Sequence, residues 1–272
     1  MFRLTCRGEI EFYEAGKLAA LDFLTHAFCT RLGGVSGGAY ASLNAGFLVG
    51  DRQEDVQRNL EGVCRAFAIP QGQLLLMGQV HGDRICVIDG DVPAGPVPEC
   101  DGLVTTRTGL ALGVRTADCV PLLFADRARR VIAAAHAGWR GTVLGIAAKM
   151  VGTLAERFGS QPEDVLVAIG PAIGPCCYEV DAPVAAAFSA RGDGGAALRQ
   201  GLQEGRWMLD LVLANRLQLL EQGVPQGNIL SSGLCTACHQ DRFFSHRASH
   251  GTAGRLINFL MLRDDVGRPK NA

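Results

Sequence analysis

Short apolar runs bounded by turn residues recur through the first two thirds of the chain. Runs of this length are typical of β-strands. We expect strands at residues 74–80, 84–88, 110–114, 120–125, 131–135 and 165–169. The first two runs should pair around a turn at residues 81–83, and the charged connection at 126–130 indicates a second hairpin.

Other stretches repeat their apolar residues at the spacing of an amphipathic helix. One lies at residues 51–67, and a longer one lies at 143–158, where Gly159 is expected to end it. Residues 181–222 also look mostly helical. Because no repeat or linker interrupts this order of elements, we predict a single α+β domain with a mixed sheet over residues 1–272.

The composition is that of a chain with a sizeable core and little net charge. Hydrophobic residues make up 48% of the 272 positions, and charged residues make up 19%. Basic and acidic residues number 26 and 27, and no basic run or aromatic platform points to nucleic acid. The N-terminal segment is interrupted by charges, and no apolar stretch reaches the ~18 residues of a membrane helix. We therefore expect a cytoplasmic protein that binds neither nucleic acid nor membranes.

Three residues with metal-binding or nucleophilic side chains stand where apolar runs end. They are His81, Cys119 and His136. Two imidazoles and one thiol can bind a zinc ion and leave its fourth position open. The same groups can form a Cys-His nucleophile pair, so both kinds of enzyme are possible at this point. Asp118, beside the thiol, is a candidate for orienting a metal ligand.

The chain resembles the YfiH/laccase-domain family, whose members are also described as polyphenol oxidases and as purine nucleoside phosphorylases. The most specific motifs are Thr-Ala-Asp-Cys-Val-Pro around Cys119 and Ala-His-Ala-Gly-Trp-Arg-Gly around His136. The resemblance extends over nearly the whole chain. It implies a sandwich of mixed β-sheet flanked by helices, related to bacterial cysteine deamidase toxins. The matching segments lie at residues 30–36, 42–44, 79–82, 101–105, 116–121, 135–141, 170–179 and 235–238.

The resemblance also implies an activity and a metal. The family's zinc ligands are a His, a Cys and a His, which fall on His81, Cys119 and His136. The family cleaves adenosine, inosine or methylthioadenosine with phosphate to give the free base and ribose 1-phosphate. Adenosine deamination is a side activity, for which zinc can activate water. We therefore expect a zinc-dependent enzyme, acting as a monomer, whose partners are purine nucleosides and phosphate.

Three further side chains are candidates for substrate contacts. Arg31 beside a glycine-rich loop and Arg140 before a predicted helix could hold phosphate, and Asn44 could contact ribose or base. Hydrogen bonds that fix the loops are an alternative role for all three. His246 stands where the family pattern leads us to expect tyrosine, which would alter the pocket wall and hence the base preference.

Other chemistries remain open from the residues alone. A multicopper oxidase needs paired His-x-His clusters, and none of the six histidines is separated from another by one residue. Two His and one Cys could still make a mononuclear copper site with an axial Met. A metal-free hydrolase would use Cys119 with His136 as its base. A non-enzymatic metal-binding scaffold is a further alternative.

The remaining cysteines do not have the spacing of a compact disulfide framework. Cys235 and Cys238 with the following histidine match the C-x-x-C-H haem motif, but no signal peptide for export accompanies it. A redox pair or a second zinc site would need two more ligands nearby, and the sequence does not point to any. Cys176 and Cys177 are expected to be packed thiols.

Overall fold

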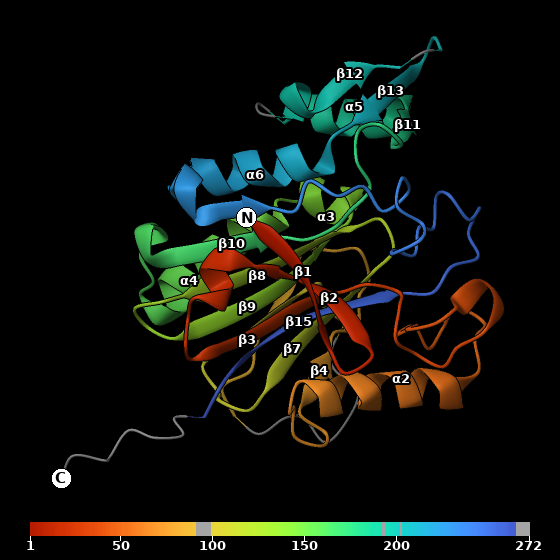
Figure 1. Cartoon of the computed structure of the whole chain (residues 1–272). Helices are drawn as coiled ribbons and strands as arrows, with labels where there is room; N and C mark the ends of the chain where they lie inside the picture. The colour runs from red at the N-terminus through yellow and green to blue at the C-terminus, as the bar shows by residue number, and fades with distance from the viewer. Residues whose placement is uncertain (91–98, 192–193, 202, 265–272) are drawn as a thin grey trace.

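Two six-stranded mixed sheets stack face to face, with helices on their outer faces (Figure 1). The computed structural model describes residues 1–90, 99–191, 194–201 and 203–264. The first sheet has the order β1 (Phe2–Arg7), β2 (Ile10–Ala15), β3 (Leu24–Cys29), β15 (Leu256–Leu262), β7 (Ala111–Thr116) and β4 (Leu74–Leu76). The second has the order β14 (Ile229–Ser231), β10 (Val165–Ile169), β8 (Val120–Asp126), β9 (Val131–Ala137), β6 (Gly102–Thr105) and β5 (Ile85–Val87).

Helices lie around the sheets (Figure 1). The α-helices are α1 (Gly16–Ala19), α2 (Gln53–Ala66), α3 (Trp139–Val143), α4 (Ile146–Phe158), α5 (Ala182–Ser189) and α6 (Leu211–Glu221). One-turn 3-10 helices are η1 (Gly38–Tyr40), η2 (Pro162–Asp164), η3 (Gly194–Ala197) and η4 (Gln226–Asn228). α2 packs on the first sheet, and α4 and α6 pack on the second. No helix in the described ranges is long and apolar enough to cross a membrane.

The strand β8 shows why the central runs are apolar at every position. Leu123 points into the core between the two sheets, whereas Leu122 and Phe124 point to the core under α4 and α6. All three side chains are fully buried. Successive residues of a strand face opposite sides, so a strand covered on both faces needs apolar residues throughout. This layering confirms the expected α+β sandwich flanked by helices.

The expected hairpin of residues 74–80 with 84–88 is wrong. β4 pairs in parallel with β7 in the first sheet, whereas β5 pairs in parallel with β6 in the second. The segment between them therefore crosses from one sheet to the other. Its backbone N–H groups bond to the carboxylate of Asp101 instead of to a hairpin partner.

Of the other predicted elements, a hairpin and a helix end are confirmed, and one region predicted to be helical contains strands. The hairpin of β8 and β9 is confirmed, as is the end of α4 at Gly159, which takes a left-handed φ of 66°. Residues 181–222 contain two strands that we did not expect, β12 (Leu198–Gln200) and β13 (Arg206–Leu209). With β11 (Glu179–Asp181) they form a three-stranded sheet in the order β11-β13-β12, at the top of Figure 1.

Acid should destabilise the protein in part through His26 on β3. This imidazole is 3% exposed, and its Nε2 accepts a hydrogen bond from the Ala15 N–H at 2.9 Å. Burial lowers the pKa of His26 from 6.5 to about 4. The unfolded chain therefore binds the proton first, so this stability is present above pH 6.5 and is lost as the pH falls toward 4. The loss should reach about 3 kcal/mol at pH 4.

Urea unfolding at pH 7 and pH 4 would measure this loss. His26→Gln keeps a hydrogen-bond acceptor for Ala15 but cannot titrate, so it should lose less stability between the two pH values than the wild type. Equal losses in both proteins would contradict the assignment to His26.

Candidate active site

Three neighbouring strands bring the chemical groups of the site together. In the second sheet, β9 lies between β6 and β8, and His136 on β9 is opposite Pro121 of β8. Cys119 immediately precedes β8, and Asp101 immediately precedes β6. The strand ends therefore place a thiol and a carboxylate on either side of one imidazole.

His81 reaches the same point from the segment that crosses between the sheets. Asp101, which is fully buried, accepts backbone hydrogen bonds from His81 at 3.0 Å and Gly82 at 2.7 Å. His81 has a left-handed φ of 61°, a conformation that is uncommon for non-glycine residues. One carboxylate thus fixes the backbone that presents His81.

The same carboxylate orients His136. The His136 Nδ1 nitrogen lies 2.7 Å from Asp101 Oδ1 and must donate to it, since an ionised carboxylate only accepts. Nε2 is then the nitrogen available as a ligand. This is the carboxylate-histidine arrangement that commonly orients metal-bound imidazoles. Sequence reasoning missed Asp101, although it lies in one of the matching motifs.

The predicted ligand atoms do come together. Those of His81, Cys119 and His136 lie within 4.8 Å of one another, and the two imidazole rings meet edge to face. Gly138 closes the group, because a Cβ atom there would lie 3.2 Å from the Cys119 sulfur. Two imidazole nitrogens and one thiolate fit a three-ligand zinc site with one open position.

The electrostatics of the site favour a thiolate. Burial would raise the pKa of Cys119, but the neighbouring His136 and His81 outweigh burial and lower it to about 6. Burial would lower the pKa of His136, but Cys119 and Asp101 raise it to about 9. The thiolate is the form that binds a metal and also the form that attacks as a nucleophile. Both sequence-based hypotheses are therefore compatible with this geometry.

A cavity of about 350 Å³ opens in front of these side chains. Its volume is within the usual range for small-molecule sites. Besides the three ligand residues it is lined by Gly46, Phe47, Leu48, Val49, Gln79, Arg115, Thr116, Ala117, His246 and Arg255. The predicted place of His246 in the pocket wall is thus consistent with the structure. The ligand group and this cavity together form the candidate site.

Two arginines that the sequence did not predict as site residues line the cavity. Arg115 lies on β7, and Arg255 directly precedes β15, the strand that pairs with β7. The guanidinium of Arg115 donates to Met77 O, and that of Arg255 donates to Ala253 O and Gly254 O. Burial, aided by Arg255, lowers the pKa of Arg115, which is how two crowded cations behave. No local motif marks either residue.

The three predicted substrate contacts lie outside the cavity lining. Arg31 donates to Ala41 O and Gln240 O and stacks over a phenylalanine ring, and exposed Arg140 stacks on the ring of Trp139. Asn44 is fully buried. Their roles as substrate contacts stay predictions. Arg31 and Asn44 make hydrogen bonds of the kind expected for the alternative role, in which they fix loops.

Asn44 nevertheless supports the cavity indirectly. Its Oδ1 accepts hydrogen bonds from the backbone N–H groups of Gly46 and Arg255, both at 2.8 Å. Both of these residues line the cavity. Asn44 therefore joins the segment after η1 to the segment before β15.

The Asp118 carboxylate bonds to two loop residues. Asp118 has a left-handed φ of 90°, and its carboxylate accepts hydrogen bonds from the Thr236 hydroxyl and the Arg247 N–H, both at 2.7 Å. These bonds attach the turn that carries Cys119 to the segment after β14. Its predicted role of orienting a metal ligand stays a prediction, and this attachment would be its means.

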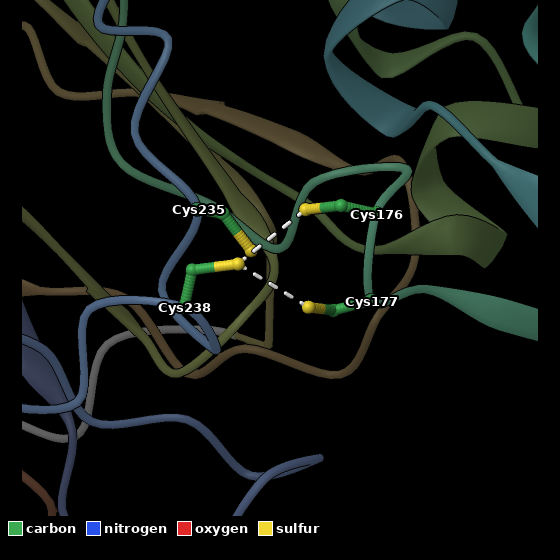
Figure 2. A group of neighbouring side chains, drawn as sticks. All are labelled: Cys176, Cys177, Cys235 and Cys238. Carbon is green, nitrogen blue, oxygen red and sulfur yellow. Dashed lines mark hydrogen bonds between the residues drawn. The ribbon is translucent and has the colours of Figure 1, made fainter.

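A second group of metal-type ligands lies nearby, contrary to our expectation. Cys176, Cys177, Cys235 and Cys238 have sulfur atoms within 4.8 Å of one another (Figure 2). The sequence pattern predicts packed thiols at the first two positions and gives no sign of this group. Their partners are about sixty positions away, and only the folded chain shows the proximity.

Comparison with known proteins decides the family. Residues 25–263 match the model of the family described as multi-copper polyphenol oxidoreductase laccase. The chain belongs to this family. Purine nucleoside phosphorylase YlmD of Geobacillus stearothermophilus is 42% identical over 244 residues, which cover 87% of this chain and 89% of that protein. Purine nucleoside phosphorylase YfiH of Escherichia coli is 36% identical over 234 residues, 86% of this chain and 91% of that protein.

Solved structures of the family have the same fold. The crystal structure of Bacillus licheniformis hypothetical protein YfiH has a TM-score of 0.89 at 37% identity, covering 96% of this chain and 99% of that one. The family description names several coppers, yet the ligand groups in the described ranges contain just two histidines, His81 and His136. This family member therefore lacks the histidine pairs of a multicopper centre there.

Proposed function

We propose that this member of the family is a zinc-dependent purine nucleoside phosphorylase. It would cleave adenosine, inosine or methylthioadenosine with phosphate, and deaminate adenosine as a side activity. The names of the relatives at 42% and 36% identity support this class of reaction. The proposal rests mainly on one structural observation. The group of His81, Cys119 and His136 faces a cavity that is also lined by two arginine side chains.

The donor set supports zinc. His81, Cys119 and His136 would hold the ion, with Asp101 keeping His136 in the tautomer that offers Nε2. Bound zinc supplies Lewis-acid polarisation to the substrate or water atom that takes its open position. Asp101 also accepts a hydrogen bond from the backbone of His81. The same carboxylate therefore positions two of the three proposed zinc ligands, His81 and His136.

Arg115 and Arg255 are suited to hold the phosphate. Both line the cavity, and their guanidinium groups donate hydrogen bonds to carbonyl oxygens. Within the described part of the chain neither forms a salt bridge, although the Asp118 carboxylate is close enough to act electrostatically on Arg255. In phosphorolysis a phosphate oxygen bonds to C1′ of ribose while the bond from C1′ to the purine nitrogen breaks. The base leaves with the electron pair and takes up a proton. A phosphate held beside the ribose would stabilise the positive charge that develops on the sugar.

The base would lie against the more apolar part of the wall. Phe47 and Leu48 supply apolar surface in the cavity, and His246 supplies a polar group that can donate or accept. His246 therefore stays our candidate for setting base preference.

Incubation of the pure protein with adenosine, with and without phosphate, would test the proposal. We expect phosphate-dependent adenine and ribose 1-phosphate, a smaller amount of inosine, loss of all three on zinc removal, and recovery when zinc is returned. Activity that survives complete metal removal would support the Cys119 and His136 hydrolase instead. Elemental analysis would show whether copper takes the place of zinc, and intact zinc binding without turnover would favour a scaffold.

The proposed phosphate contacts of Arg115 and Arg255 can be tested separately by substitution. Arg255→Met should raise the KM for phosphate by at least about tenfold, since a hydrogen bond to a charged group contributes about 1.5–3 kcal/mol. Arg115→Met should act in the same direction. Steady-state kinetics with phosphate varied at saturating nucleoside would measure both.

Arg140→Met and Arg31→Met are the matched controls for this prediction. Each removes a guanidinium that stacks on an aromatic ring outside the cavity lining. We expect the KM for phosphate to change little in either. If these variants raise it and the cavity variants do not, the phosphate lies where the sequence-based hypothesis placed it.

A further inference from the structure

Four cysteines meet where two distant segments lie side by side (Figure 2). Cys176 and Cys177 follow β10, and Cys235 and Cys238 follow β14. The Cys238 sulfur lies 3.5 Å from the Cys176 sulfur and 3.4 Å from the Cys177 sulfur. The four sulfurs converge on one point instead of packing singly into the core.

We propose that these four cysteines form a structural zinc site, separate from the site in the cavity. A tetrahedral ion with zinc-sulfur bonds of about 2.3 Å holds its sulfurs about 3.8 Å apart. The sulfurs here lie within 4.8 Å of one another, so small side-chain movements would suffice. Four thiolates and no other donor favour a soft metal, and four-cysteine sites with closed coordination are typical of structural zinc.

One backbone donor favours a thiolate at Cys235. The backbone N–H of Gly174 points at the Cys235 sulfur at 3.2 Å, which stabilises negative charge on that sulfur. Cys235 is buried, whereas Cys176 and Cys238 are exposed. The group is thus anchored on one side and open to an entering ion on the other.

The geometry argues against the two other uses of such cysteines. A disulfide joins two sulfurs at about 2.0 Å, yet Cys238 approaches Cys176 and Cys177 almost equally, so no pairing is preferred. Haem attachment through Cys235 and Cys238 would leave two other thiols crowded against the same sulfurs. A single tetrahedral ion uses all four.

The proposed zinc would join segments that support the candidate active site. Thr236, between two of the cysteines, donates to the Asp118 carboxylate, and the Ile173 N–H donates to Asp118 O at 2.9 Å. Asp118 precedes Cys119, the ligand in the cavity. The four-cysteine site would therefore hold together the two segments, around Ile173 and Thr236, that donate hydrogen bonds to the turn of Cys119.

Zinc content per chain tests the proposal directly. The full chain, purified with zinc under reducing conditions, should contain about two zinc ions, one in each site. Cys238→Ser and Cys177→Ser should each lower this to about one, and Cys119→Ser should also leave about one. Combining Cys238→Ser with Cys119→Ser should leave none. Because zinc is counted independently of turnover, failure of this proposal is distinguishable from failure of the phosphorylase proposal.

Controls separate loss of a ligand from loss of the fold. Cys6→Ser, which removes an exposed thiol from β1, should keep both ions. Cys238→His should recover much of the zinc lost in Cys238→Ser, since three thiolates and one imidazole also form structural zinc sites. Cobalt substitution of the wild type should add the strong thiolate charge-transfer absorption of a four-sulfur site, which Cys238→Ser should lose.

Three results would overturn the proposal. One is a wild type with a single zinc that survives in Cys238→Ser and disappears in Cys119→Ser. Another is a disulfide among these cysteines in protein kept reduced throughout, seen as a mass deficit after alkylation. The third is iron in place of zinc at this group.

Discussion

Cys119→Ser should lose zinc from the cavity site and lose phosphorolysis by more than about 100-fold. The serine hydroxyl is not ionised at neutral pH, whereas the protein lowers the pKa of the Cys119 thiol to about 6. Removing a ligand should cost more than removing a residue that only orients one, for which losses of about 10- to 100-fold are typical. Zinc content and kcat/KM for adenosine would be measured together.

Cys119→Asp separates the two roles of this thiol. A carboxylate can complete a three-ligand zinc site with two histidines, but it cannot serve as a thiolate nucleophile. We expect Cys119→Asp to retain more zinc and more activity than Cys119→Ser. Equal inactivity of two variants that differ in zinc content would mean that the sulfur takes part in the chemistry. Cys29→Ala, which removes a buried thiol beneath α2, is the control for lost packing and should keep zinc and activity.

Asp101→Asn should lower zinc affinity and activity by about 10- to 100-fold. The amide removes the negative charge that faces His136 Nδ1. It also turns an N–H₂ group toward backbone donors, because the carboxylate oxygens accept from His81 and Gly82. Zinc affinity, from competition with a chelator, and kcat/KM should therefore fall together. Asp101→Ala should be more severe, since no acceptor is left for the partly buried N–H groups of His81 and Gly82.

A second buried aspartate provides the comparison for this prediction. Asp126 is fully buried at the end of β8 and also accepts two backbone hydrogen bonds, from Ala128 and Arg129. Asp126→Asn should reduce stability without changing zinc affinity. If both variants changed zinc affinity equally, Asp101 would contribute through general stability and not through orientation of His136.

The local pattern predicted elements better than it predicted their partners. The hairpin of β8 and β9 followed from two apolar runs and a five-residue charged connection, because nearby strands with a short link pair readily. The same reasoning failed for β4 and β5, which belong to different sheets. There the buried carboxylate of Asp101, some twenty positions later, holds the connecting backbone. A contact of that range leaves no mark on local periodicity.

In the candidate site, too, some residues could be predicted from the sequence and others could not. His81, Cys119 and His136 could be named from their motifs, because donor chemistry is a property of the residue itself. The arginines of the cavity wall could not be found, since Arg115 and Arg255 become neighbours only through the pairing of β7 with β15. The arginines that the motifs did suggest, Arg31 and Arg140, stack on aromatic rings elsewhere.

The sequence by itself determined most of the strands and helices of the two large sheets, the donor set of the candidate zinc site and the exclusion of a multicopper centre. These properties depend on residue type and on spacing over a few positions. Only the tertiary structure decided which strands are neighbours, which cations face the cavity and that Cys176 and Cys177 meet Cys235 and Cys238. Such contacts join residues far apart in the chain, and they depend on the packing of two whole sheets.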